Sequence, residues 1–296
     1  MSLRWNWPSW CAVLFLAVSS QKWTEAQEFQ SPSPEKSSIQ VFLTALDKHG
    51  SPATPTDSEL KVFVDKQPAQ IKALQPAKNA PLLFAVLVDA SRSDLANAES
   101  IRKAALYLFQ SLTSDTSRGY LVLFNISAAI SKQPLQVSQV QSALDGVQFG
   151  GGTAVYDAIE QTCIQKLSRS GNPDTPRRAI MLISDGDDNQ SHVTRHSAEE
   201  AAAKEGVAVF SLTTEPTVAD TRGEYFLKEI SHDTGGEVVR SKNLTDGVAL
   251  LIAAIESQWA LSFVPAQPSD KKVHSLDIKT SQKGVRISAP TRILFQ

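Results

Sequence analysis

The chain has few cysteines and little excess charge, and each shortage excludes a class of protein. Its 296 residues include two cysteines, Cys11 and Cys163, which excludes a framework of several disulfides. The formal net charge is -2 and the sequence has no basic stripe, so we expect no nucleic-acid partner. Internal repeats are also lacking. The remaining composition, with 42% apolar and 20% charged residues, is typical of a globular protein.

No apolar run in the sequence is long enough to span a membrane, which takes about 20 residues. The early run Trp10–Val18 is shorter, and Thr24–Ala26 suits a cleavage site. We therefore expect a signal peptide at residues 1–26, a secreted or periplasmic (cell-envelope) protein, and no transmembrane segment after signal removal. An uncleaved anchor or a buried strand is the alternative. Removal of Cys11 would leave Cys163 alone, and its helical surroundings favour a buried thiol.

Short strands are expected near both ends of the chain. Residues 27–38 are rich in Ser, Pro, Gln and Glu, which is typical of a linker. Strand patterns follow at Ile39–Leu46, Leu60–Val64 and Ala69–Leu74, and later at Trp259–Val264, His274–Thr280, Val285–Ser288 and Arg292–Phe295. Two or three short strands bury too little apolar surface to be stable alone. We therefore expect residues 39–78 and 260–296 to pair into one small β unit.

Residues 79–259 show a different pattern, in which apolar runs alternate with helical periodicity. The continuous apolar runs, typical of strands covered on both faces, are Leu82–Val88, Tyr120–Phe124, Ala179–Ile183 and Val207–Leu212. One helical face is predicted from the spacing of Leu95, Ala98, Ile101, Ala105, Leu108 and Leu112. This alternation predicts an α/β domain with a doubly wound, mostly parallel sheet flanked by helices, as in Rossmann-like folds.

Oxygen-bearing side chains follow the first buried strand, at a carboxyl end where open α/β sheets bind ligands. Asp89, Ser91 and Ser93 occupy alternating positions there. Two later loops can reach the same edge: one has Thr153 after three glycines, and the other has Asp185. Oxygen ligands suit hard cations, so these side chains form a candidate site for Mg²⁺, with Mn²⁺ or Ca²⁺ also possible. A polar loop cluster without metal is the alternative.

The three loops together resemble the metal-ion-dependent adhesion site of von Willebrand factor type A (VWA) domains. The matching motifs are Asp-x-Ser-x-Ser, Gly-Gly-Thr and Ser-Asp-Gly, in that order, within about residues 81–259. The resemblance implies that the metal ligands are Asp89, Ser91, Ser93, Thr153 and Asp185. In this family the two serines are usually direct ligands, whereas the threonine and the second aspartate bind directly or through water.

The resemblance also implies a function in binding. The divalent cation would complete its coordination shell with an acidic side chain of a protein partner, in adhesion or envelope assembly. A scaffold subunit with a structural metal is an alternative. Many family members have Gly where this chain has Arg92, and a charge there would help to attract an acidic partner if it were not simply solvated. The whole chain is similar to bacterial secreted "VWFA-related" proteins, described especially from acidobacteria, which implies no known activity.

The polar residues beside these motifs have structural explanations. Asp94 is expected to cap the helix that begins there, because its charge favours a helix N-terminus. Asp187 and Asp188 lie near enough in sequence to tune the electrostatic field of the metal, and turn and helix-start acids are the alternative. His192 and His196 have zinc-like spacing, but no Glu stands between them as in His-Glu-x-x-His, so we expect them at a solvated helix start.

An enzyme is the main rival to a binding module, and the motifs argue against it. Phosphotransferases of the haloacid dehalogenase type need a second Asp two residues after the first, where this chain has Ser91. No Gly-x-Ser-x-Gly elbow surrounds the serines, and no obvious general base accompanies Asp89 and Asp185 to support a metal-dependent hydrolase. Gly150–Gly152 lack the following Lys-Ser/Thr of a phosphate loop. We therefore expect no catalytic residues.

Overall fold

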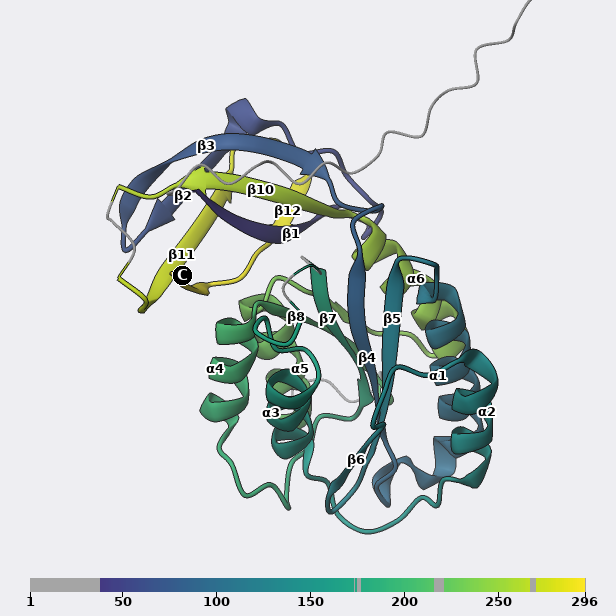
Figure 1. Cartoon of the computed structure of the whole chain (residues 1–296). Coiled ribbons are helices and arrows are strands. Elements are labelled where there is room, and N and C mark those ends of the chain that lie inside the picture. The colour runs from purple at the N-terminus through teal and green to yellow at the C-terminus, as the bar shows by residue number, and fades with distance from the viewer. Residues whose placement is uncertain (1–37, 173, 175–176, 216–220, 267–269, 296) are drawn as a thin grey trace, which may run out of the picture.

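The structure is a computed structural model that describes residues 38–172, 174, 177–215, 221–266 and 270–295. The expected signal peptide, and the expected linker except for residue 38, lie outside the described residues. The described chain forms two sheets that lie one above the other in Figure 1. Among the helices of these ranges, none combines the length and the apolar character that crossing a membrane requires.

The central unit is built on a six-stranded sheet with the order β6-β5-β4-β7-β8-β9. Its strands are β4 (Leu82–Asp89), β5 (Ser117–Phe124), β6 (Ala128–Ile130), β7 (Arg177–Ser184), β8 (Val207–Thr213) and β9 (Val238–Val239). All neighbouring pairs are parallel except β5 with β6. Every residue of β4, β7 and β8 is buried, as expected of strands covered on both faces. The predicted doubly wound, mostly parallel sheet is confirmed.

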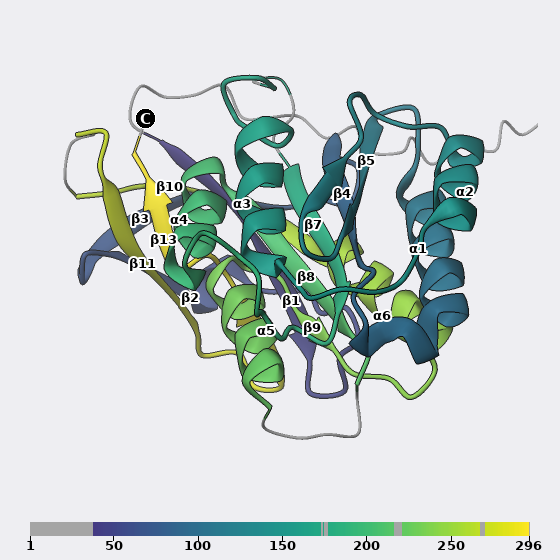
Figure 2. The ribbon, with the colours of Figure 1, turned by 90° about the horizontal axis from the view of Figure 1, so that it is seen from below.

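Helices cover both faces of this sheet (Figures 1 and 2). One face packs against α1 (Ala98–Leu112), α2 (Val137–Gly146) and α6 (Leu244–Glu256), and the other against α3 (Val155–Gln165), α4 (Arg195–Glu205) and α5 (Arg222–Asp233). Each layer has its own apolar core. Cys163 is buried in the second core, as expected, and burial raises the pKa of its thiol.

One end of the predicted helical pattern is wrong. Leu95 was expected on the buried face, but it lies in a short 3-10 helix, η2 (Ser93–Asn97), and is 55% exposed. The α-helix begins only at Ala98, because the chain first has to turn out of the loop that follows β4. From Ala98 onward, the predicted apolar residues of α1 are buried.

The second sheet is antiparallel and combines strands from both ends of the chain, as predicted. Its order is β12-β1-β10-β3-β2-β11-β13. The strands, with short 3-10 helix η1 (Asp57–Glu59) before β2, are β1 (Ile39–Asp47), β2 (Leu60–Val64), β3 (Gln67–Pro76), β10 (Gln258–Val264), β11 (Val273–Thr280), β12 (Val285–Ser288) and β13 (Arg292–Leu294). Early strands pair with late ones in β1–β12, β1–β10, β3–β10 and β2–β11, so neither end of the chain builds this sheet alone.

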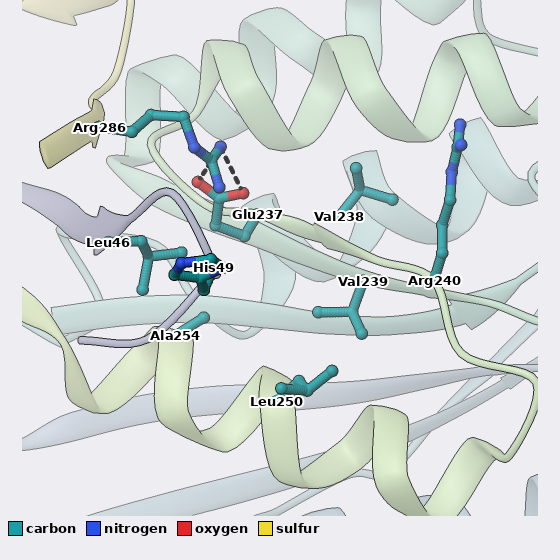
Figure 3. A pocket seen from close by; sticks show the side chains of 10 residues that line it. Leu46, His49, Glu237, Val238, Val239, Arg240, Leu250, Ala254 and Arg286 are labelled. Carbon is teal, nitrogen blue, oxygen red and sulfur yellow. Dashed lines mark hydrogen bonds and ion pairs between the residues drawn. The ribbon is translucent and has the colours of Figure 1, made fainter. Parts of the chain in front are cut away.

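The two units meet through buried polar contacts. The Arg177 guanidinium donates hydrogen bonds to the backbone oxygens of Ala77 and Ile255, both at 2.9 Å, and to the side chain of Gln258 at 3.1 Å. These acceptors lie where the chain passes between the sheets. Figure 3 shows a second contact, in which Arg286 of the antiparallel unit meets Glu237 beside a pocket at the junction.

Candidate metal centre

The five predicted site residues lie in loops at one edge of the parallel sheet. Asp89 is the last residue of β4, and its neighbours β5 and β7 lie on opposite sides of it. The loops therefore diverge at β4, which leaves room for a ligand at this point of an open α/β sheet. In Figure 1 the carboxyl end of β4 lies away from the antiparallel sheet. The edge is therefore not covered by the second unit.

The Asp89 carboxylate is buried and held between two strands. One oxygen accepts the backbone N–H of Ser91 at 2.9 Å, and the other accepts the Ser184 hydroxyl at 2.6 Å. Ser184 ends β7, and its Oγ in turn accepts the backbone N–H of Gly186 at 2.9 Å. Burial raises the pKa of Asp89 to about 6; the two serines oppose this shift, and the charge of Asp185 adds to it.

The hydroxyl oxygens of Ser91 and Ser93 lie 3.0 Å apart, in the loop that Asp89 begins. Octahedral Mg²⁺ binds oxygen at about 2.0–2.1 Å, which places adjacent ligands about 2.9 Å apart. The observed separation therefore suits two neighbouring ligands of one small cation. Ser91 is buried and Ser93 is exposed, so the pair lies at the boundary between protein and solvent.

The loop before α3 is fixed against the Asp89 loop. Arg92 donates its backbone N–H to the Gly151 carbonyl at 3.2 Å, and Gly150 donates to the Ala90 carbonyl at 2.7 Å. Thr153 is buried, and its backbone N–H reaches the side-chain oxygen of Asn189 at 2.9 Å. This segment therefore connects the first loop to the third.

The loop of Asp185 is shaped by close backbone packing against α5. Gly186 has φ +83°, and a Cβ there would lie 2.4 Å from the Gly223 carbonyl oxygen, so only glycine fits. Asp185 is 8% exposed, and one of its oxygens accepts the Asp187 backbone N–H at 3.0 Å. The fold thus brings the three predicted loops together, and ligation of a metal by their side chains stays a prediction.

Asp94 was predicted to cap a helix, and this prediction is wrong. Helix η2 has no side-chain cap, and the Asp94 carboxylate is fully buried, with no hydrogen-bond partner for either oxygen within the described chain. The Thr214 hydroxyl is also buried without a hydrogen-bond partner in the described chain. Burial, followed by the charge of Asp89, raises the pKa of Asp94 to about 8.

This electrostatic arrangement fits a divalent cation. A buried polar group without a partner costs about 1–3 kcal/mol, and more if it is charged. After burial, the charges of Asp89 and Asp185 also raise the pKa of Asp94. No group of three or more His, Cys, Asp or Glu residues in the described ranges is arranged to hold a metal by itself. Ligation by the serine hydroxyls beside these carboxylates stays a prediction.

The other polar residues near this edge have structural contacts. Asp188 accepts the backbone N–H of Tyr156 at 3.2 Å and the hydroxyl of Ser191 at 2.6 Å. The exposed ring of His192 meets the buried Asp157, which also accepts two backbone N–H groups of the same loop. These contacts agree with the expected roles of Asp188 and His192 in a turn and at a helix start.

The fold and the site geometry together define a class: a doubly wound α/β domain that gathers carboxylate and hydroxyl oxygens at its strand switch point. Comparison with known families identifies this class. The sequence model of the von Willebrand factor type A domain matches residues 84–251, which is more than half of the chain. The chain therefore belongs to the VWA domain family. None of the curated proteins compared with it matches.

Solved structures resemble the chain at low sequence identity. A von Willebrand factor type A protein from Catenulispora acidiphila is 12% identical, with 91% of this chain and 76% of that chain covered and a TM-score of 0.50. Proximal thread matrix protein 1 from the mussel byssus, solved with a zinc-occupied MIDAS motif, is 17% identical, with coverages of 65% and 49% and a TM-score of 0.50. An aerotolerance-related membrane protein from Bacteroides fragilis is 18% identical, with coverages of 59% and 98% and a TM-score of 0.47. At these identities, the two similarities with a TM-score of 0.50 show the fold alone.

Proposed function

We propose that this protein is a metal-dependent binding module, in which a divalent cation completes its coordination shell with an acidic side chain of a partner protein. Membership of the VWA family supports the general part of this proposal, because VWA domains are generally non-catalytic protein-interaction modules. The specific part, a cation at the edge of the sheet, depends on the residues of this chain. Adhesion and envelope assembly are the two settings that fit such a module.

The observation that carries the proposal is the pair of adjacent hydroxyls, Ser91 and Ser93, beside the buried carboxylate of Asp89. These three residues would hold the cation, together with Thr153 and Asp185 from the neighbouring loops. Mg²⁺ is the ion we propose, because it binds through few carboxylates and keeps exchangeable positions in its shell. When bound, the ion supplies a positive centre that an outside carboxylate can reach. Arg92 is exposed in the same loop and adds positive charge.

We also propose that the protein works outside the cytoplasm, in the envelope or beyond it. The expected signal peptide at residues 1–26 supports this proposal. In the proposed domain arrangement, residues 79–259 form the binding domain, and residues 39–78 and 260–296 form the β unit behind it. The site then faces a partner while the β unit lies on the opposite side (Figure 1).

Cation binding is tested by titration calorimetry of the full chain with Mg²⁺, Mn²⁺ and Zn²⁺; zinc is included because it occupies the MIDAS motif of the mussel protein. We expect the parent protein to bind, and Asp89→Ala to lose binding while its circular dichroism spectrum is unchanged. Asp115→Ala is the matched control, since it removes an exposed aspartate outside the site. Equal uptake by the parent and Asp89→Ala would show that the site is assigned wrongly.

Partner recognition needs a second experiment. Proteins of the producing cell's envelope are captured on the full chain in Mg²⁺, and the capture is repeated in EDTA and with Asp89→Ala. We expect a partner that is retained only in Mg²⁺ and only by the parent protein, and that is lost when one of its acidic residues is changed to the amide. A partner retained equally in EDTA would contradict a bond through the cation.

A further inference from the structure

The burial of Asp94 and Leu95 is the reverse of what their chemistry favours. Asp94 is fully buried, whereas Leu95 beside it is 55% exposed. Charged side chains are rarely buried without a partner, and the described chain offers neither Asp94 oxygen a hydrogen bond. Helix η2 therefore keeps a carboxylate inside at a position where an apolar side chain was available. A group bound beside Asp94 would supply the partner that the described chain does not.

The position of Asp94 indicates where that group lies. Asp94 directly follows Ser93, and the charges of Asp89 and Asp185 both act on it. The Thr214 hydroxyl, which follows β8, is also buried without a partner in the described ranges. The Thr214 carbonyl accepts the side-chain N–H of Asn97, at the other end of η2, at 3.4 Å. Two unpartnered oxygen-bearing groups thus lie at the same edge of the sheet as the proposed cation.

We infer that Asp94 is a positioning residue of the cation site, whose buried carboxylate raises the affinity of the site for a divalent cation with no direct bond to the metal. This inference rests on the proposed function. The direct ligands in this inference remain the five predicted residues. An outer carboxylate of this kind typically changes metal affinity by about 10- to 100-fold. It also lets the site hold its cation without a partner, so loading with metal and binding of the partner become separate steps.

The test compares the full chain with Asp94→Asn, which has nearly the same shape and no charge, and with Asp94→Ser, a smaller neutral variant. Asp94→Glu restores the charge, and Asp115→Asn is the control for loss of an exposed acid. Titration calorimetry with Mg²⁺ alone is expected to give about 10- to 100-fold weaker binding for both neutral variants. We expect parent-like binding for Asp115→Asn and partial recovery for Asp94→Glu.

Thermal unfolding gives a second measurement that a purely structural role would not move in the same way. In EDTA we expect the neutral variants to melt no lower than the parent, because the buried carboxyl group of the parent has no hydrogen-bond partner in the described chain to lose. In saturating Mg²⁺ we expect the parent to gain more than the variants do. Parent-like Mg²⁺ affinity in either folded neutral variant would overturn the role of Asp94. If the parent itself takes up no cation, the proposed site fails, and the inference fails with it.

Discussion

Glu237 and Arg286 connect the two units of the protein. One guanidinium nitrogen of Arg286 lies 2.8 Å and 2.9 Å from the two carboxylate oxygens of Glu237, and the Ser288 hydroxyl donates to the same carboxylate at 2.6 Å. The side chain of Glu237 is 9% exposed, whereas that of Arg286 is 55% exposed. The carboxylate is thus the group that water cannot solvate when the pair is broken. The cost of breaking the pair should depend on which partner is removed.

We expect Arg286→Met to lower the free energy of unfolding by about 1–3 kcal/mol, because it leaves the buried Glu237 charge short of a partner. Adding Glu237→Gln should recover part of this loss, because the charge is then gone. Urea denaturation of the two single variants and the double variant measures the coupling. Lys279→Met is the control: its pair with Asp277 is exposed, so the loss should stay below about 1 kcal/mol. Strictly additive losses for Arg286 and Glu237 would contradict this prediction.

Arg177 is expected to be the most sensitive residue at the junction. Its guanidinium donates hydrogen bonds to carbonyls in both segments that connect the two sheets, at Ala77 after β3 and at Ile255 before β10. Each buried carbonyl that loses its partner costs about 1–3 kcal/mol of stability. Arg177→Met should therefore lower the free energy of unfolding by at least about 3 kcal/mol. Arg177→Lys should be nearly as harmful, since one ammonium cannot reproduce the planar fork. Chemical denaturation measures both, and a mild effect of Arg177→Lys would show that the charge alone matters.

The surface cluster of Asp65, Asp270 and His274 should make stability depend on pH. His274 Nδ1 lies 2.6 Å from Asp65, and its Nε2 lies 2.8 Å from Asp270. The hydrogen bond with Asp65 is the main cause that raises the pKa of His274 above 6.5, and hydrogen bonds with His274 are the main cause that lowers the pKa of both aspartates below 3.8. The stabilisation of the folded protein by charged His274 is complete below pH 6.5 and is lost as the pH rises through the raised pKa of His274. The stabilisation by the two charged aspartates is complete above pH 3.8 and is lost as the pH falls through their lowered pKa values.

Both contributions are present together only between these limits. We therefore expect the melting-temperature difference between the parent protein and His274→Asn to be largest between about pH 4 and 6.5, and to shrink on either side. Lys272 also faces Asp270, at 3.9 Å. His196→Asn, which changes an exposed histidine of α4, is the matched control. A difference that is constant from pH 3 to 9 would contradict the prediction.

Removal of Lys271–Gln296 is expected to cause aggregation. The deletion removes β11, β12 and β13, which uncovers one side of β1 and one side of β2. Uncovered strands present unpaired backbone groups to other molecules. Size-exclusion chromatography with light scattering measures the outcome. A monomeric, soluble truncated chain would show that the early strands do not depend on the late ones.

The sequence predicted those parts of the fold that carry a local pattern. The uninterrupted apolar runs ending at Val88 and Ile183 indicated strands covered on both faces, and both strands are buried throughout. Helix α2 was missed because it is short and buries only Val140 and Leu144, which is too weak a periodic signal. The contacts of Arg177 and Glu237 could not be predicted, since they join segments about 50 to 100 residues apart and leave no trace in local spacing.

The candidate site was predictable in its loops but not in its electrostatics. The positions of Asp89 and Asp185 followed from the rule that parallel strands end at a common edge. The burial of Asp94 did not follow, because an acid at the start of a helix normally caps it. The environment of the Asp94 side chain is determined by the turn of the chain in η2, which directs Leu95 outward and Asp94 inward.

The central position of β4 has a mechanical consequence. This strand runs from the junction with the antiparallel sheet, at Leu82, to the candidate site at Asp89, and it pairs along its length with β5 and over Leu82–Val88 with β7. Because β4 is covalently joined to the antiparallel unit through the segment that follows β3, a load applied at Asp89 would pass along its backbone to the junction. The ladders with β5 and β7 would hold the strand straight on both sides.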